Sequence, residues 1–168
     1  MMRVAFLIAA SLALSGCGLR PLYGGGSSSP VATTLRAIEV APIDGQVGWL
    51  MHNKLADRLG GSATAPAAYR LEVELDDNIT GFGIRGDRAV TRERRTLRAR
   101  YRLIDLGNGG VVLDATAGSD AGIDVVSSEY ATVAAEQTAV ERLSEVVADQ
   151  IVARLGLFAA RTAPPPVR

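Results

Sequence analysis

The feature that most limits the fold of this chain is a regular alternation of side chains over residues 91–104. Leu97, Ala99, Tyr101 and Leu103 occupy one set of alternate positions, and the opposite set is rich in arginine. Successive side chains of a β-strand point to opposite faces of a sheet. The pattern therefore predicts a strand with one face buried in a core and the other face in water.

Three further segments predict a sheet of about four strands. Residues 69–76 alternate in the same way, with acidic side chains on the outer face, and Asp77-Asn78 is expected to end that strand. Asn108-Gly109 is a tight-turn signal and predicts an antiparallel hairpin between residues 91–104 and a strand from 111 to about 121. Residues 34–40 are expected to form the first strand.

Two helices are expected from apolar residues at helical spacing. The first carries Trp49, Leu50, Leu55 and Leu59 and stops at Gly60-Gly61. The second begins at Ser127 or Ser128, is expected to stop at Gly156, and carries the stripe Val133, Val140, Leu143, Val147, Ile151 and Leu155. The predicted fold class is α+β, with a largely antiparallel sheet of about four strands and two helices packed on one face.

The N-terminus has the pattern of an export signal, with Arg3 followed by a short apolar run over residues 4–14. Leu14-Ser15-Gly16-Cys17 resembles the lipobox of bacterial lipoproteins, in which the cysteine becomes the lipidated N-terminus. Cys17 is the only cysteine, so it cannot form a disulfide within the chain. Gly18 is not the aspartate that holds such proteins at an inner membrane, so the resemblance implies a lipid anchor in the outer membrane, with the body facing the periplasm.

The expected organisation is a signal peptide over residues 1–16, then the lipidated cysteine and a flexible tether over 17–33. A single periplasmic α+β domain over 34–161 and a proline-rich disordered tail over 162–168 complete the chain. Basic and acidic residues both number 18, so the whole chain offers no bulk field for nucleic acid. His52 is the only histidine, and we expect neither a metal site nor a cofactor beyond the covalent lipid on Cys17.

No combination of residues predicts catalysis. The chain lacks a spare cysteine nucleophile, and its histidine has no evident serine and acid partners. Gly81-x-Gly83-x-x-Gly86 precedes a strand rather than a helix, which makes it a poor phosphate loop. We therefore expect a binding or structural protein and not an enzyme.

Arginine is the only concentrated functional chemistry. Eight arginines occur between Arg85 and Arg102 against the acids Asp87 and Glu93, and guanidinium groups suit phosphate or carboxylate ligands. Two interpretations stay open for the strand arginines: cross-strand ion pairs with Glu72, Glu74 and Asp76, or binding of an anionic ligand. A ligand role is favoured for Arg85 and Arg88 in the loop. The weaker candidates on the strand are Arg92, Arg94, Arg98, Arg100 and Arg102.

The chain resembles the LptE family of lipopolysaccharide-assembly lipoproteins. Gly16-Cys17-Gly18-Leu19-Arg20-Pro21-Leu22-Tyr23 is similar to the start of that family, and Ile84-Arg85-Gly86-Asp87 is similar to its loop between the second and third strands. The resemblance implies a non-enzymatic plug inside a large outer-membrane β-barrel, LptD, that assists barrel folding and lipopolysaccharide delivery. It also implies lipopolysaccharide binding at Arg85, with Arg88 as a weaker extension.

Two other functions remain as alternatives. One is an accessory lipoprotein of a lipid-transporting ABC system, and the other is a lipoprotein activator of a cell-wall synthase. A tether of about 14 residues spans only about 20 Å as a flexible coil, which favours work close to the membrane.

Overall fold

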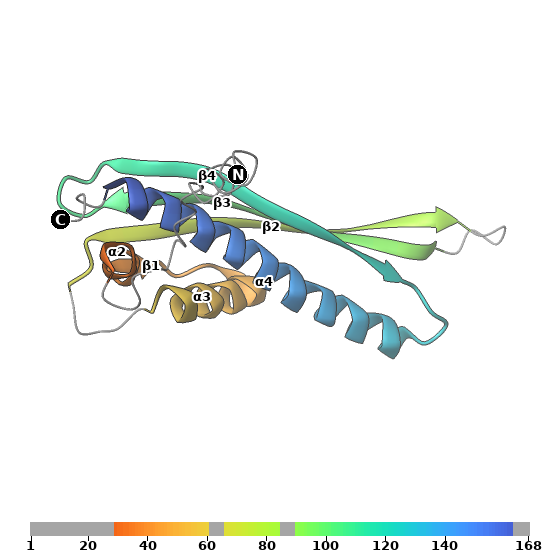
Figure 1. Cartoon of the computed structure of the whole chain (residues 1–168). Coiled ribbons are helices and arrows are strands. Elements are labelled where there is room, and N and C mark those ends of the chain that lie inside the picture. Colours follow the sequence, from red (N-terminus) through yellow and green to blue (C-terminus); the bar gives the residue numbers. More distant parts are fainter. Residues whose placement is uncertain (1–28, 61–65, 85–89, 163–168) are drawn as a thin grey trace, which may run out of the picture.

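The computed structural model describes residues 29–60, 66–84 and 90–162. Within them the chain forms two layers, a four-stranded sheet and three helices that lie on one side of it (Figure 1). The elements are α2 (Pro30–Arg36), β1 (Ile38–Val40), α3 (Gly45–Leu59), β2 (Tyr69–Ile84), β3 (Val90–Asp105), β4 (Val111–Asp124) and α4 (Glu129–Thr162). The predicted α+β class is confirmed, with one helix more than expected.

The strands lie in the order β1-β2-β3-β4. β1 pairs with β2 in parallel, whereas the β2–β3 and β3–β4 pairs are antiparallel. In the register, Leu71 lies opposite Leu103 and Leu103 lies opposite Leu113. The apolar positions of the three long strands therefore share one face, as the alternation predicts.

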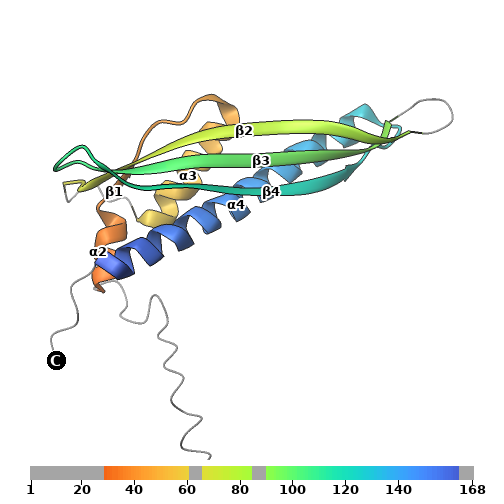
Figure 2. The same cartoon turned by 90° about the horizontal axis from the view of Figure 1, so that it is seen from above.

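The core lies between that face and the helices. Leu97, Ala99, Tyr101 and Leu103 are all buried, and they pack in one cluster with residues from α3 and α4. On α4 the predicted stripe is buried from Val140 onward, but Val133 is exposed. Full burial of one such aliphatic side chain contributes about 1.5–3 kcal/mol. α4 crosses under the sheet at an angle, and its N-terminal turns separate from the sheet (Figures 1 and 2).

The expected first strand over residues 34–40 is only partly correct, because residues 30–36 form α2. The Ser29 side chain accepts a hydrogen bond from the Ala32 amide at 3.1 Å, and Pro30 stands in the first turn. A serine cap followed by proline is a strong helix start. The strand β1 begins only at Ile38.

The expected break at Asp77-Asn78 is wrong, and β2 runs without interruption to Ile84. Asp77 lies opposite Leu97 on the helix-facing side of the sheet. Its carboxylate accepts a hydrogen bond from Arg95 Nε at 2.8 Å. Arg95 thus compensates the charge of Asp77. From the local sequence alone, that aspartate indicates the end of a strand.

The expected stop at Gly156 is also wrong. α4 continues to Thr162 and keeps Gly156 buried. Past the glycine, Ala159 is buried and Phe158 packs edge-on against Tyr69, with ring centroids 5.7 Å apart. This packing supports the last turns. No helix in the described part of the chain is long and apolar enough to span a membrane.

α3 ends as predicted, because Gly60 adopts the left-handed conformation with φ of +65° and its N–H caps the Ala56 carbonyl. Its buried face differs from the predicted one. Met51, Leu55 and Leu59 form the buried stripe, whereas Trp49 is 67% exposed. The helix is therefore rotated so that its only tryptophan points away from the core.

Candidate functional site on the arginine face

The face of the sheet opposite the helices carries the predicted arginine column. Arg92, Arg94, Arg98, Arg100 and Arg102 lie on β3, a central strand, with β2 on one side and β4 on the other. Among the residues that the structure describes, all the helices lie on the other side (Figure 1). The column is therefore open to a partner or to water.

The acidic residues of β2 lie where the cross-strand interpretation expects them. Glu72 is opposite Arg102, Glu74 is opposite Arg100, and Asp76 is opposite Arg98. Sequence reasoning missed a second set of acids on β4, namely Asp114, Asp120 and Asp124, which share the open face. The signal that could have revealed them is that each lies an even number of residues from the next, which puts all three on one face of a strand.

The open face of the three long strands is consequently balanced in charge. Its ionisable residues are the arginines 70, 92, 94, 98, 100 and 102 and the carboxylates 72, 74, 76, 114, 120 and 124. The positive charge of the strand column is thus balanced by carboxylates of β2 and β4. The strand column alone does not form a strongly electropositive surface.

Four of the five column arginines form ion pairs. The nitrogen–oxygen distances are 2.9 Å for Arg92–Asp124, 3.9 Å for Arg94–Asp120, 3.0 Å for Arg100–Asp114, 3.0 Å for Arg102–Glu72 and 3.8 Å for Arg102–Glu74. The hydrogen bond from Arg100 lowers the pKa of the Asp114 carboxyl and raises that of the guanidinium. Exposed pairs of this kind contribute little to stability, because water and salt screen them.

Arg98 differs from the other four. It forms no ion pair with any residue that the structure describes. Its side chain lies against the backbone of Gly118 on β4, where a Cβ would stand 2.9 Å from Arg98 Cδ. The missing side chain at Gly118 gives the arginine room to turn away from Asp76. Arg98 is the column residue with the most freedom to meet an external anion.

Arg95 lies on the opposite face and holds the layers together. Its guanidinium pairs with Asp77 and donates to the Glu136 carbonyl of α4 at 2.9 Å. The side chains of Arg95 and Asp77 are only 12% and 21% exposed. The hydrogen bonds to Asp77 raise the pKa of Arg95. Its contacts with Asp77 on β2 and with the Glu136 carbonyl on α4 make Arg95 a structural residue.

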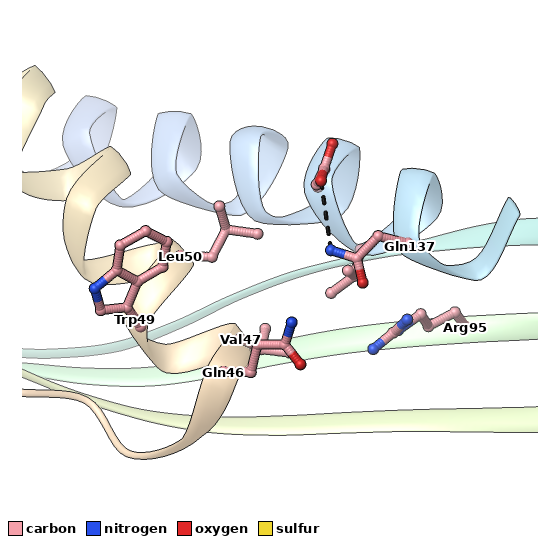
Figure 3. A pocket seen from close by; sticks show the side chains of 8 residues that line it. Gln46, Val47, Trp49, Leu50, Arg95 and Gln137 are labelled. Carbon is pink, nitrogen blue, oxygen red and sulfur yellow. Dashed lines mark hydrogen bonds between the residues drawn. The ribbon is translucent and has the colours of Figure 1, made fainter. Parts of the chain in front are cut away.

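Arg95 also borders a small cavity of about 140 Å³ between α3, β3 and α4. Figure 3 shows Trp49, Leu50 and Val47 of α3 on one side and Gln137 of α4 on the other. Gln137 Nε2 donates to Glu141 Oε1 at 3.4 Å. Sequence reasoning did not find this cavity, because it assigned Trp49 to the core.

The other predicted site residues, Cys17, Arg85 and Arg88, lie outside the described residues. In the described part of the chain, no cluster of histidine, cysteine or acidic residues could hold a metal ion.

The sequence model of the LptE family, described as lipopolysaccharide-assembly, matches residues 35–155. The match covers every strand and most of α4. This chain belongs to the LptE family. LptE proteins form a non-enzymatic lipopolysaccharide-assembly family.

Solved structures of lipoproteins share this fold. A Caulobacter crescentus protein described as a lipoprotein is 28% identical, covers 82% of this chain and 100% of its own, and gives a TM-score of 0.66. Rare lipoprotein B from Shewanella oneidensis is 10% identical, with coverages of 74% and 96% and a TM-score of 0.58. A minor lipoprotein from Acinetobacter baumannii is 14% identical, with coverages of 76% and 94% and a TM-score of 0.55. The last two show the shared fold alone. No significant match was found among curated proteins.

Proposed function

We propose that this LptE-family protein is a lipoprotein of the outer membrane that plugs and helps assemble a large lipopolysaccharide-export β-barrel of the LptD kind. The family match over residues 35–155 carries the proposal, because it spans both layers of the fold. The protein performs no catalysis in this role. It acts as a scaffold and as a binding surface for lipopolysaccharide.

The membrane anchor is the lipid on Cys17. Each acyl chain contributes about 0.8 kcal/mol per buried methylene, and two or more chains hold a protein stably on a bilayer. The body of the protein then stays on the periplasmic side, close to the barrel. Replacing Cys17 by alanine would release the chain from the membrane without touching the folded layers.

The open face of the sheet suits contact with a barrel lumen. The interior of a large outer-membrane barrel is polar. A face with equal numbers of arginines and carboxylates, most of them paired, can meet such a wall without leaving an excess of buried charge. An apolar face would not tolerate the water-filled lumen before assembly.

Lipopolysaccharide binding is assigned to Arg85 and Arg88, with lipid A phosphates as the ligand groups. Guanidinium forks bind phosphate with paired hydrogen bonds. Most of the strand arginines already have carboxylate partners. Arg98 is the strand residue that could extend the site, since its guanidinium forms no ion pair within the described residues.

Affinity purification of the full-length lipoprotein from detergent-solubilised outer membranes tests the barrel partnership. We expect mass spectrometry to find one large β-barrel in a stoichiometric amount. Recovery of ABC-transporter components would instead favour the lipid-transport alternative, and recovery of a cell-wall synthase would favour the activator. Either of those results would contradict the plug.

A charge-reversal experiment tests the ligand site separately. Arg85→Glu combined with Arg88→Glu should weaken lipopolysaccharide binding by about tenfold or more at low salt, because screening is weakest there. The matched control is Arg92→Glu with Arg100→Glu, which changes the net charge equally on the strand. Equal losses in the two variants would mean that overall charge, and not the loop, governs binding.

A further inference from the structure

The outer edge of β2 is left unpaired over most of its length. β1 pairs only with residues 69–71, and the last backbone hydrogen bond at this edge runs from the Ala41 amide to the Leu71 carbonyl at 2.9 Å. Alternate residues of a strand direct their N–H and C=O to the same edge. In the described part of the chain, the outward groups of Val73, Leu75, Asp77 and Ile79 have no backbone partner.

The other edge of the sheet is treated differently. β4 packs against α4, and the Gln150 side chain of α4 bonds to the β4 backbone at Gly118. The Gly118 amide donates to Gln150 Oε1 at 3.2 Å, and Gln150 Nε2 donates to the Gly118 carbonyl at 3.4 Å. A side-chain amide thus takes the place of a neighbouring strand. At Gly118 this contact blocks strand addition, whereas no side chain bonds to the outer edge of β2 over residues 73–79 among the described residues.

The free edge is bordered by acidic side chains that are poorly neutralised. Glu74 is 74% exposed and its nearest ion-pair partner, Arg102, is 3.8 Å away. Asp76 forms no ion pair within the described residues, because Arg98 opposite it lies over Gly118. Two copies of β2 placed edge to edge would bring these carboxylates together, and like charges opposite one another are destabilising. Self-pairing is therefore disfavoured, whereas a basic strand would be attracted.

Apolar side chains lie below the same edge, on its helix side. Ile79 lies opposite Arg95 in the β2–β3 register and is 40% exposed. Arg95 lines the cavity in Figure 3 together with Trp49 and Gln137. The side chains of an added strand that point toward the helices would lie beside Ile79 and cover its exposed part.

We propose that the outer edge of β2 between Val73 and Ile79 binds an extended segment of a partner polypeptide in which basic and apolar residues alternate. β3 shows the required pattern, because it sits on the inner edge with arginines opposite the acids and apolar residues toward the core. The bound segment adds a strand to the sheet by β-augmentation. Its basic residues face Glu74 and Asp76, and its apolar residues lie beside Ile79 on the helix side.

A peptide-binding experiment with the full-length lipoprotein in detergent tests this inference. The probe is a short capped peptide of alternating arginine and valine, compared with one of alternating glutamate and valine. We expect only the basic peptide to bind, and we expect it to slow amide exchange at residues 73–79. Absence of binding, equal binding of the acidic peptide, or protection confined to other segments would overturn the proposal.

Two sets of variants locate the contact. Ile79→Pro removes one outward N–H but no bond to β3, and proline is tolerated at strand edges, so binding should weaken about fivefold to tenfold. Ile79→Val keeps the N–H and is the control. Should the proline variant fail to fold, Glu74→Gln with Asp76→Asn should weaken binding while Asp114→Asn on β4 does not. Unchanged binding in both sets would overturn the proposal, while barrel co-purification and lipopolysaccharide affinity would report on the proposed function independently.

Discussion

The two faces of β3 show how one strand serves two purposes. On the helix-facing side, Leu97 and Leu103 are completely buried in the core. On the other side, Arg100 and Arg102 form exposed ion pairs with neighbouring strands. Burial supplies large, cooperative stabilisation, whereas exposed pairs supply little each. Side chains of the open face can therefore change to suit a binding partner with little effect on the stability of the fold.

The sharpest test of this difference compares two adjacent residues. Leu103→Ala should lower the free energy of unfolding by about 2–5 kcal/mol, because it removes buried carbons and leaves a cavity. Arg102→Ala should lower it by no more than about 1 kcal/mol. Urea denaturation followed by circular dichroism measures both. Similar losses in the two variants would show that the open face contributes to stability as the core does.

Arg95 is the one arginine of the described part of β3 that lies on the helix-facing side of the sheet. Arg95→Ala should destabilise the fold by about 1–3 kcal/mol, since it leaves the partly buried carboxylate of Asp77 without its charged partner. Asp77→Asn in the same background should recover part of that loss. Arg92→Ala is the control, because that ion pair is exposed. Equal losses of stability in Arg95→Ala and Arg92→Ala would contradict the view that the ion pair on the helix-facing side stabilises the fold more than the exposed pairs do.

The smallest expected effect is a pH dependence on the open face. The pKa of Asp114 is held below its ordinary value of 3.8, mainly by the hydrogen bond from Arg100. A lowered folded-state pKa contributes stability above the unfolded-state pKa, and this contribution is lost as the pH falls through the folded-state pKa. Arg100→Gln should return the Asp114 pKa toward 3.8, as measured by carboxyl NMR titration. A pKa that does not move would show that the pair is absent in solution.

Features determined by local periodicity were predictable from the sequence. The alternation of β3, the hairpin at Asn108-Gly109, most of the α4 stripe and the stop at Gly60 are all present. These depend on side-chain period and on backbone preferences that adjacent residues define. The serine cap and proline that begin α2 are local signals too. They follow a run of glycines and serines, so the sequence analysis assigned them to a flexible tether.

Features determined by distant contacts were not predictable. Asp77 continues a strand because Arg95 pairs with it, and Gly156 stays helical because Phe158 packs on Tyr69 beyond it. Similarly, the charge balance of the open face depends on aspartates that β4 brings beside β3. The sequence therefore predicted where arginine is concentrated but not how far neighbouring strands neutralise it.

Controlled depletion of this lipoprotein in its native cell, with lipopolysaccharide quantified at the cell surface, tests the central claim most directly. The account predicts that surface lipopolysaccharide falls as the protein is lost, that newly made lipopolysaccharide accumulates behind the outer membrane, and that the wild-type chain restores export. Unchanged surface lipopolysaccharide after complete depletion would contradict a role in its assembly.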